Sequence, residues 1–447
     1  MKKEIVFSVL LFLISSLSTF SQTCWLIENT PNFIIETKVE GDNLSAYSRK
    51  GALKDYFSPI KWYLIKKKYQ LEHDELFNCK GVYSLNHHAY LGIYKMFYDT
   101  PKRFKMSISN NDLTLILYSE NDSIYLKGKK VDLNYSQNNY NQLYKSIFEK
   151  TDSNIFNSNY LKTLSFRKAK KELENVSHKI RDDYEFYYSF YLSTTIARQL
   201  NFTHFYLKTN TSSSKTPSIV LREINSNTCV LDIDGFQGDR LKIDSLINKI
   251  QSKNYQNLII DLRNNGGGTF ETASSLGNFI STKPIIAGLF PNRNWYDKTK
   301  SYPTIADTNE FTSFNNGTLE QFFELANSKS GVYIETIPND KPFKGNLYLL
   351  VNNQTASTAE VVAMAFKDYK LGTIVGKKTA GALLSMKLFK LNDLFEIGIP
   401  TNDFVSVHGF RVDKKGIEPD IKTGSKDALN HTLELIKQKE IFKNDQE

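Results

Sequence analysis

Apolar and polar positions in the second half of the chain switch between short runs of strand length and longer runs with helical spacing. The runs expected to form buried strands are residues 229–233, 257–261, 345–351 and 373–375. Amphipathic or apolar stretches of helical length follow three of them, at residues 241–250, 269–280 and 359–369. This alternation is typical of an α/β domain built in layers, with mostly parallel strands.

The first half of the chain has a different pattern. Two strand-like runs, 113–118 and 123–126, flank a turn and predict a hairpin, and a helix is expected near 143–150. Helical spacing then covers 168–180 and 184–198, and 205–207 read as the next strand. The predicted organisation is a mixed α+β N-terminal domain of unknown role at 22–155, a helical subdomain at 156–210, an α/β core at 211–425 with a long polar insertion at 281–344, and a C-terminal helix or tail at 426–447.

The N-terminus has the features of a secretory signal peptide. Lys2 and Lys3 precede an apolar stretch, which ends in a small-x-small sequence before Gln22. A retained anchor is the alternative, but the stretch is short against the roughly 20 apolar residues of a membrane span. We therefore expect residues 1–21 to be removed and the protein to be secreted or periplasmic, with no later segment that crosses a membrane.

Length and composition indicate the number of domains and the classes of partner and metal site that are not expected. About 425 mature residues exceed what one hydrophobic core usually serves, so at least two domains are expected. The net charge of +9 is spread along the chain without an arginine-rich block, which argues against nucleic acid as a partner. Three cysteines, Cys24, Cys79 and Cys229, permit at most one disulfide and do not have metal-ligand spacing.

A glycine-rich segment follows the strand predicted at 257–261. The segment runs from Asp261 to Gly268 and ends in three glycines. Glycine exposes its backbone amide because no Cβ shields it, and exposed amides suit a developing oxyanion. A tight turn is the ordinary alternative for such a run.

Ser357 lies where the strand predicted at 345–351 gives way to the next helix. Its hydroxyl is expected above the sheet edge, with the following amide, that of Thr358, directed into the same space. The alternative is a helix cap, because Glu360 stands three residues on and would complete a capping box.

Four motifs in fixed order carry a family resemblance. Residues 261–268 and 357–360, followed by Gly376-Lys-Lys-Thr-Ala-Gly381 and Gly416-Ile-Glu-Pro-Asp420, resemble the C-terminal processing peptidase and tricorn family of serine peptidases over residues 184–421. The resemblance implies a crotonase/Clp-like core and a serine endopeptidase with Ser357 as nucleophile. It further implies an oxyanion hole of Gly268, Gly267 and Thr358, peptide or unfolded protein as substrate, and no metal or organic cofactor.

The resemblance also bears on the catalytic base. Processing peptidases carry a lysine twenty-five residues past the serine, where this chain has Ala382. The tricorn-like branch instead uses a histidine supported by a hydroxyl and a carboxylate, which here implies His204, Thr203 and Asp413. An aspartate stands where that branch has a glutamate. The alternatives are a His204 held within a local aromatic cluster and His408 as the base.

Other functions remain open at this stage. Residues 208–228 are too few for the PDZ domain that many processing peptidases carry, so PDZ capture of substrate C-termini is not expected. Two features suit a second hypothesis, a non-catalytic protein that keeps the fold and binds a peptide or glycan. One is the aspartate that stands where the tricorn-like branch has a glutamate, and the other is the N-terminal domain of unknown role. Hydrolysis of an ester or another acyl bond would use the same machinery.

Overall fold

The computed structural model describes most of the chain after the expected signal peptide. The described residues are 22–29, 31–69, 73–96, 100–120, 122–197, 199–210, 217–237 and 240–444. The signal peptide expected at residues 1–21 lies outside them. Within the described ranges, no helix combines the length and apolar character that a membrane span needs.

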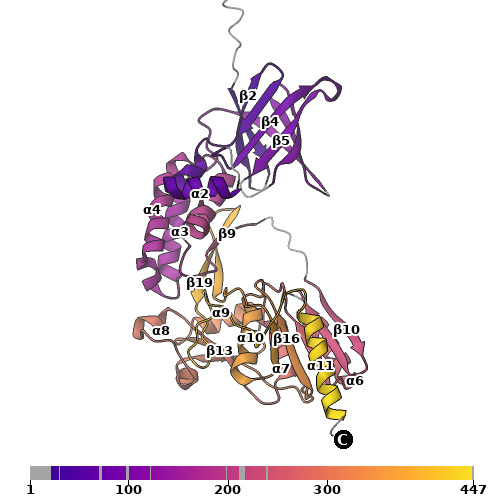
Figure 1. Ribbon diagram of the computed structural model, residues 1–447. Coiled ribbons are helices and arrows are strands. Elements are labelled where there is room, and N and C mark those ends of the chain that lie inside the picture. The colour runs from indigo at the N-terminus through magenta and orange to yellow at the C-terminus, as the bar shows by residue number, and fades with distance from the viewer. Residues whose placement is uncertain are drawn as a thin grey trace, which may run out of the picture.

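The N-terminal region is a closed barrel of eight antiparallel strands (Figure 1). The hairpin predicted at 113–118 and 123–126 is confirmed as β7 and β8. The expected mixed α+β domain is corrected in its arrangement, because its strands close on one another into a barrel. Alternate residues of β7, Leu113, Leu115 and Leu117, fill the barrel interior. The strands are β1 (Gln22–Glu28), β2 (Phe33–Glu40), β3 (Asn43–Tyr47), β4 (Phe77–Ser84), β5 (Ala89–Met96), β6 (Lys102–Ile108), β7 (Asp112–Tyr118) and β8 (Ser123–Val131), with helix α2 (Pro59–Tyr69) between β3 and β4.

The three cysteines do not pair. Cys24 lies on β1 and Cys79 on β4, and both are buried in the barrel region with free thiols. Cys229 is buried in the C-terminal core and is also free. The disulfide that the sequence permitted is therefore absent from the described residues.

Helices connect the barrel to the C-terminal core. Helix α4 (Leu164–Val176) buries one side chain per turn, Phe166, Ala169, Leu173 and Val176, and this spacing explains why the segment is helical. The other elements of this region are α3 (Tyr140–Asn154), α5 (Asp183–Tyr191) and the π-helix η5 (Leu192–Ala197). One hydrophobic cluster runs from the barrel through these helices to the core, so the boundaries expected at 155 and 210 stay predictions.

The core is a six-stranded sheet in which five strands are parallel, as the sequence pattern predicted. Its order is β10-β11-β12-β16-β17-β20, and the edge strand β10 is antiparallel to β11. The bounds are β10 (Ile219–Asn225), β11 (Thr228–Ile233), β12 (Asn257–Asp261), β16 (Asn346–Val351), β17 (Thr373–Gly376) and β20 (Ile421–Lys422).

Both faces of this sheet are covered. On β12, Leu258 and Ile260 pack into one hydrophobic cluster with the side chains of three helices, while Ile259 packs into another cluster with the C-terminal helix. Burial on two faces explains why the strands read as continuous apolar runs rather than as alternating ones. The helices are α6 (Arg240–Lys253), α7 (Phe270–Ile280) and α10 (Thr358–Tyr369) on the first face and α11 (Ala428–Asn444) on the second.

Residues 281–344, expected to be a polar insertion, contain a small folded unit. Phe290, Phe314 and Phe322 are buried together, which corrects the view of this segment as simply polar. Its elements are β13 (Ile286–Pro291), α8 (Arg293–Lys298), β14 (Thr312–Phe314), α9 (Leu319–Ala326) and β15 (Gly331–Glu335). A separate sheet of β18 (Ser385–Lys390), β19 (Phe395–Asn402) and β9 (Tyr206–Thr209) joins the helical region to the core.

Candidate active site

Ser357 sits on a strained turn between β16 and α10. Its φ of 56° and ψ of −127° lie outside the regions that a residue with a Cβ normally adopts. Such a conformation costs on the order of 1–3 kcal/mol and persists only where the surroundings fix it. Here the Ser357 amide donates to the Ala382 carbonyl over 2.9 Å and to Glu360 Oε2 over 3.2 Å. The serine itself is half-buried.

Glu360 joins this turn to a neighbouring loop. Its side chain is fully buried, and burial raises its pKa, while four hydrogen-bond donors stabilise the carboxylate. Besides Ser357, these donors are the Thr379 hydroxyl at 2.6 Å, the Gly381 amide at 2.8 Å and the Ala382 amide at 2.9 Å. The carboxylate thus holds the 376–382 loop against the turn, and Ala382 stands beside Ser357 where processing peptidases have a lysine.

The glycine-rich segment packs directly against the Ser357 turn. A Cβ added to Gly267, whose φ is 99°, would lie 2.6 Å from Ser357 Cβ and 3.0 Å from the Thr358 nitrogen. A Cβ on Gly268, at φ 145°, would lie 2.4 Å from the backbone of Phe236. Thr358 Oγ1 donates to the Gly268 carbonyl over 2.7 Å and closes the contact. Only glycine permits this approach.

The amides of this segment are not equivalent. Gly267 donates its N–H to Asn265 Oδ1 over 2.8 Å, so this amide is occupied, and Gly267 is corrected from a donor to a spacer. The hydrogen bonds among the described residues include none donated by the Gly268 or Thr358 amide. Gly268 and Thr358 therefore keep two amides available on adjoining backbone segments, which is the arrangement that an oxyanion hole needs.

His204, Thr203 and Asp413 form one hydrogen-bonded chain. The Thr203 hydroxyl lies 2.5 Å from Asp413 Oδ1 and 2.8 Å from His204 Nδ1. A carboxylate only accepts, so the hydroxyl donates to Asp413 and accepts from Nδ1–H. This order leaves His204 Nε2 as the unprotonated ring nitrogen. The two segments are 210 positions apart in the chain.

Burial shapes the chemistry of this chain of groups. Desolvation lowers the pKa of His204 to about 4, so the imidazole is neutral at physiological pH. Burial also raises the pKa of Asp413, and the adjacent Arg411 guanidinium opposes that rise. Arg411 donates to Asp413 Oδ2 over 3.0 Å and to Asp403 over 2.7 Å.

Backbone hydrogen bonds connect the segment of Asp413, which binds Thr203, to the Ser357 turn. Asp413 is followed by Lys414, whose amide donates to the Gly381 carbonyl over 2.7 Å, and Ala382 in turn accepts from the Ser357 amide. In the described part of the chain, no hydrogen bond connects Ser357 Oγ to the imidazole. The structure thus places the two side chains on neighbouring segments without a direct bond.

His408, the rival base, lies elsewhere. It is exposed and interacts with the carboxylate of Asp368, near the C-terminal end of α10. Ser357 caps the opposite end of that helix, and about ten residues at roughly 1.5 Å each separate the two ends by about 15 Å. The geometry therefore favours His204 over His408 as the partner of Ser357.

Sequence reasoning missed several residues of this site. Asp403 and Arg411 form a buried ion pair behind Asp413, and Asn265 orients the glycine segment through its side chain. The short spacing of Arg411 and Asp413, two residues apart in the sequence, was a signal, because a cation this close to a carboxylate is a candidate ion-pair partner. Nothing local in the sequence indicates Asp403 as their partner.

Comparison with known proteins gives one matching family model. Residues 227–423 match peptidase family S41. This range contains Ser357 and Asp413, while Thr203 and His204 lie before it.

Several characterised proteins are similar over the same region. They include a carboxyl-terminal-processing protease of Synechocystis sp., 29% identical over 174 residues (39% of this chain, 32% of the relative), and a tail-specific protease of Haemophilus influenzae, 25% identical over 205 residues (44% and 24%). The nisin-resistance protein of Lactococcus lactis is 26% identical over 223 residues (48% and 62%). The chain thus spans less than two thirds of the length of each.

Solved structures are similar at low identity. A lipoprotein from Streptococcus agalactiae superposes with a TM-score of 0.45 at 17% identity, over 69% of this chain and all of the other, and the tricorn protease with a TM-score of 0.35 at 10% identity, over 90% and 52%. The part of the chain that matches a known family is thus residues 227–423, which are similar to peptidase family S41.

Proposed function

We propose that this protein is a serine endopeptidase that hydrolyses peptide bonds through an acyl-enzyme on Ser357. The observation that supports the proposal is the hydrogen-bonded chain of Asp413, Thr203 and His204, whose Asp413 segment is bonded through the 381–382 loop to the Ser357 turn. That chain fixes the tautomer in which His204 Nε2 can accept a proton, which is the requirement for a general base. The match of residues 227–423 to peptidase family S41 supports the same reaction class.

The proposed reaction follows from the positions of these groups. Ser357 Oγ attacks the substrate carbonyl while its proton passes to His204 Nε2. The amides of Gly268 and Thr358 stabilise the oxyanion that develops on the carbonyl oxygen. His204 then protonates the leaving amine, and a water molecule, deprotonated by the same imidazole, hydrolyses the ester on Ser357. Asp413 and Thr203 position the imidazole throughout.

The nature of the N-terminus supports a proposal about location. Lys2, Lys3 and the apolar stretch that follows have the pattern of a signal peptide, so we propose that the protein is exported and acts as a secreted or periplasmic enzyme. Export would give a mature N-terminus at Gln22. N-terminal sequencing of protein recovered from outside the cytoplasm checks this, and an intact Met1 in that fraction would contradict it.

Replacing the proposed nucleophile and base should remove activity. Ser357→Ala is expected to lower kcat/KM for peptide hydrolysis by at least about a thousandfold and to abolish labelling by a fluorophosphonate. His204→Gln should have a comparable effect, because glutamine cannot accept the proton. His408→Gln is the matched control and should keep most of the activity. Labelling that persists in the Ser357→Ala protein would overturn the assignment.

Thr203 offers a test of the relay itself. Thr203→Val keeps the shape but removes the hydroxyl that links His204 to Asp413, so kcat should fall roughly 100-fold with little change in KM. Thr203→Ser restores the hydroxyl and should recover most of kcat. Equal losses in the two variants would show that the site responds to packing, not to the hydrogen bond.

The pH dependence has a defined direction. A general base works only when deprotonated, and the pKa of His204 is lowered to about 4 from its ordinary value near 6.5. The acid limb of kcat/KM should therefore lie well below pH 6.5, with activity kept near pH 5. Between about pH 6.5 and pH 4, His204 binds a proton in the unfolded chain but not in the folded chain. The free energy of unfolding therefore falls as the pH drops through this range. An acid limb centred near pH 6.5, measured while circular dichroism shows folded protein, would contradict the assignment.

A further inference from the structure

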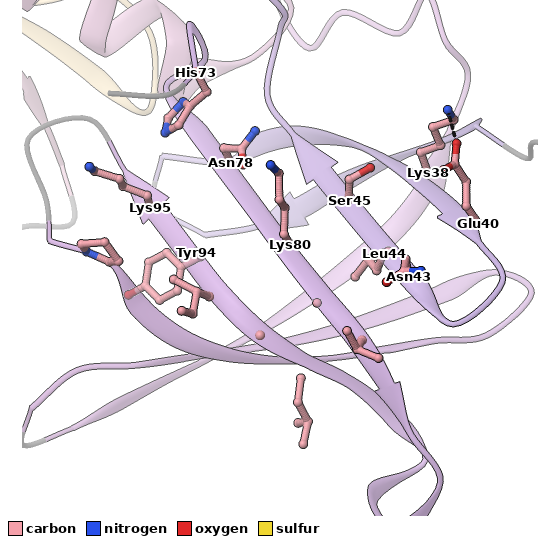
Figure 2. Close-up of a pocket in the computed structure, with 16 residues that line it drawn as sticks. Lys38, Glu40, Asn43, Leu44, Ser45, His73, Asn78, Lys80, Tyr94 and Lys95 are labelled. Atoms are coloured by element: carbon pink, nitrogen blue, oxygen red, sulfur yellow. Dashed lines mark ion pairs between the residues drawn. The ribbon is translucent and has the colours of Figure 1, made fainter. Parts of the chain in front are cut away.

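The outer surface of the barrel has a groove of about 830 Å³ over strands β2 to β5. Figure 2 shows Ser45, Asn78, Lys80 and Lys95 projecting from neighbouring strands on this side. The barrel interior is filled by other residues, such as Phe104 and Met106, which belong to the hydrophobic core. The groove is therefore an external surface feature and not a cavity inside the barrel.

The charge on this surface is mainly positive, since three lysines and one carboxylate, that of Glu40, line the groove. Strands β4, β5 and β6 contain the basic residues Lys80, Lys95, Lys102, Arg103 and Lys105 and no acidic residue. Strand pairing aligns Lys38, Ser45, Lys80, Ile93 and Arg103 in one row across five strands. Lys38 has an ion-pair partner, Glu40 (Figure 2), whereas Lys80 and Arg103 form no ion pair with any described residue.

Apolar side chains lie between these cations. Val82 is 55% exposed and Ile93 57% exposed, and Leu91 lies opposite Val82 in the strand pairing. Contact of aliphatic side chains with water is unfavourable. A ligand that covers these side chains removes that cost in free energy. The groove thus offers basic and aliphatic groups to the same ligand. We call this surface the barrel groove, defined by Lys80, Val82, Leu91 and Ile93, which line it, and by Arg103, which pairs with Ile93 on the adjacent strand β6.

We propose that the barrel groove binds an extended acidic segment of a polypeptide substrate, an inference that rests on the proposed peptidase function. Four interstrand steps of about 4.8 Å make the row from Lys38 to Arg103 about 19 Å long, the length of roughly six extended residues. Carboxylates would pair with Lys80 and Arg103, and aliphatic side chains would cover Val82 and Ile93.

The position of the barrel narrows the substrate class. In Figure 1 the barrel and the core sheet lie at opposite ends of the molecule, with α3 and α4 between them. A ligand held in the groove reaches Ser357 only if it is a long, unfolded chain. The barrel groove would then recruit unfolded proteins by an acidic segment remote from the bond that is cut, and raise the local concentration of that bond at Ser357.

Binding to the full-length Ser357→Ala protein tests the proposal without interference from cleavage. The probe is a fluorescein-labelled peptide of about twelve residues that alternates glutamate and valine, and its control has glutamine in place of glutamate. We expect the acidic peptide to bind and Lys80→Glu to raise its Kd roughly tenfold. Lys127→Glu, an equally exposed barrel lysine on β8, should change the Kd less than twofold. The Kd of the Lys80→Gln protein should lie between that of the protein with Lys80 and that of the Lys80→Glu protein.

Two results would overturn the proposal. The first is that Lys80→Glu and Lys127→Glu change the Kd of the acidic peptide equally. The second is that the peptide does not bind while phosphatidylglycerol vesicles bind in a Lys80-dependent way, which would indicate that the groove binds a membrane surface.

A cleavage assay separates this proposal from the proposed function. It compares a short neutral peptide with an unfolded protein that carries an acidic segment, using the chain with Ser357 intact. The Lys80→Glu variant should lose activity on the unfolded protein and keep its activity on the short neutral peptide. Acidic-peptide binding without cleavage of either substrate would refute the peptidase and leave the groove, whereas cleavage of both substrates unaffected by Lys80→Glu would refute the groove alone.

Discussion

A buried guanidinium holds the candidate site together. Arg411 lies between the carboxylates of Asp403 and Asp413, and all three side chains are almost completely shielded from solvent. Buried carboxylates are stable only when charge and hydrogen bonds replace water. Tyr296 supplies a further bond to Asp403, and Thr203 supplies one to Asp413. The ion cluster therefore joins the insertion, the C-terminal loops and the helical region at one point.

The position of the candidate base depends on this cluster. His204 follows the π-helix η5 and has a φ of 58°, so the local backbone by itself does not favour its conformation. The hydrogen bond from its Nδ1 to Thr203 connects it to Asp413 and thus to the ion cluster. A histidine on an irregular segment thereby acquires a defined orientation. Strained backbone conformations of this kind are common at functional sites, where the surrounding structure holds them in place.

The Ser357 turn depends on a different constraint, close backbone approach. Gly267 and Gly268 have no Cβ, and this allows their segment to contact the Ser357 turn and Phe236 at distances that other residues forbid. Glu360 fixes the opposite side of the turn through four donors. The amides of Gly268 and Thr358 are thus held by packing before any substrate arrives, which is what electrostatic catalysis requires.

The sequence by itself determined the four inner strands of the core sheet, the three helices on its first face and the hairpin of β7 and β8, because apolar runs and helical spacing report burial directly. It also indicated Ser357 and the glycine segment, since both motifs are local. Tertiary structure alone decided that the N-terminal strands close into a barrel, because strand pairing over a hundred residues leaves no local signal. Closure also aligned Lys80 and Arg103 on one surface. The resemblance had already implied the grouping of Thr203, His204 and Asp413, but the contact of Thr203 with Asp413, 210 positions away, and that of Asp403 with Tyr296 exist only in the folded chain, which brings distant segments within hydrogen-bond reach.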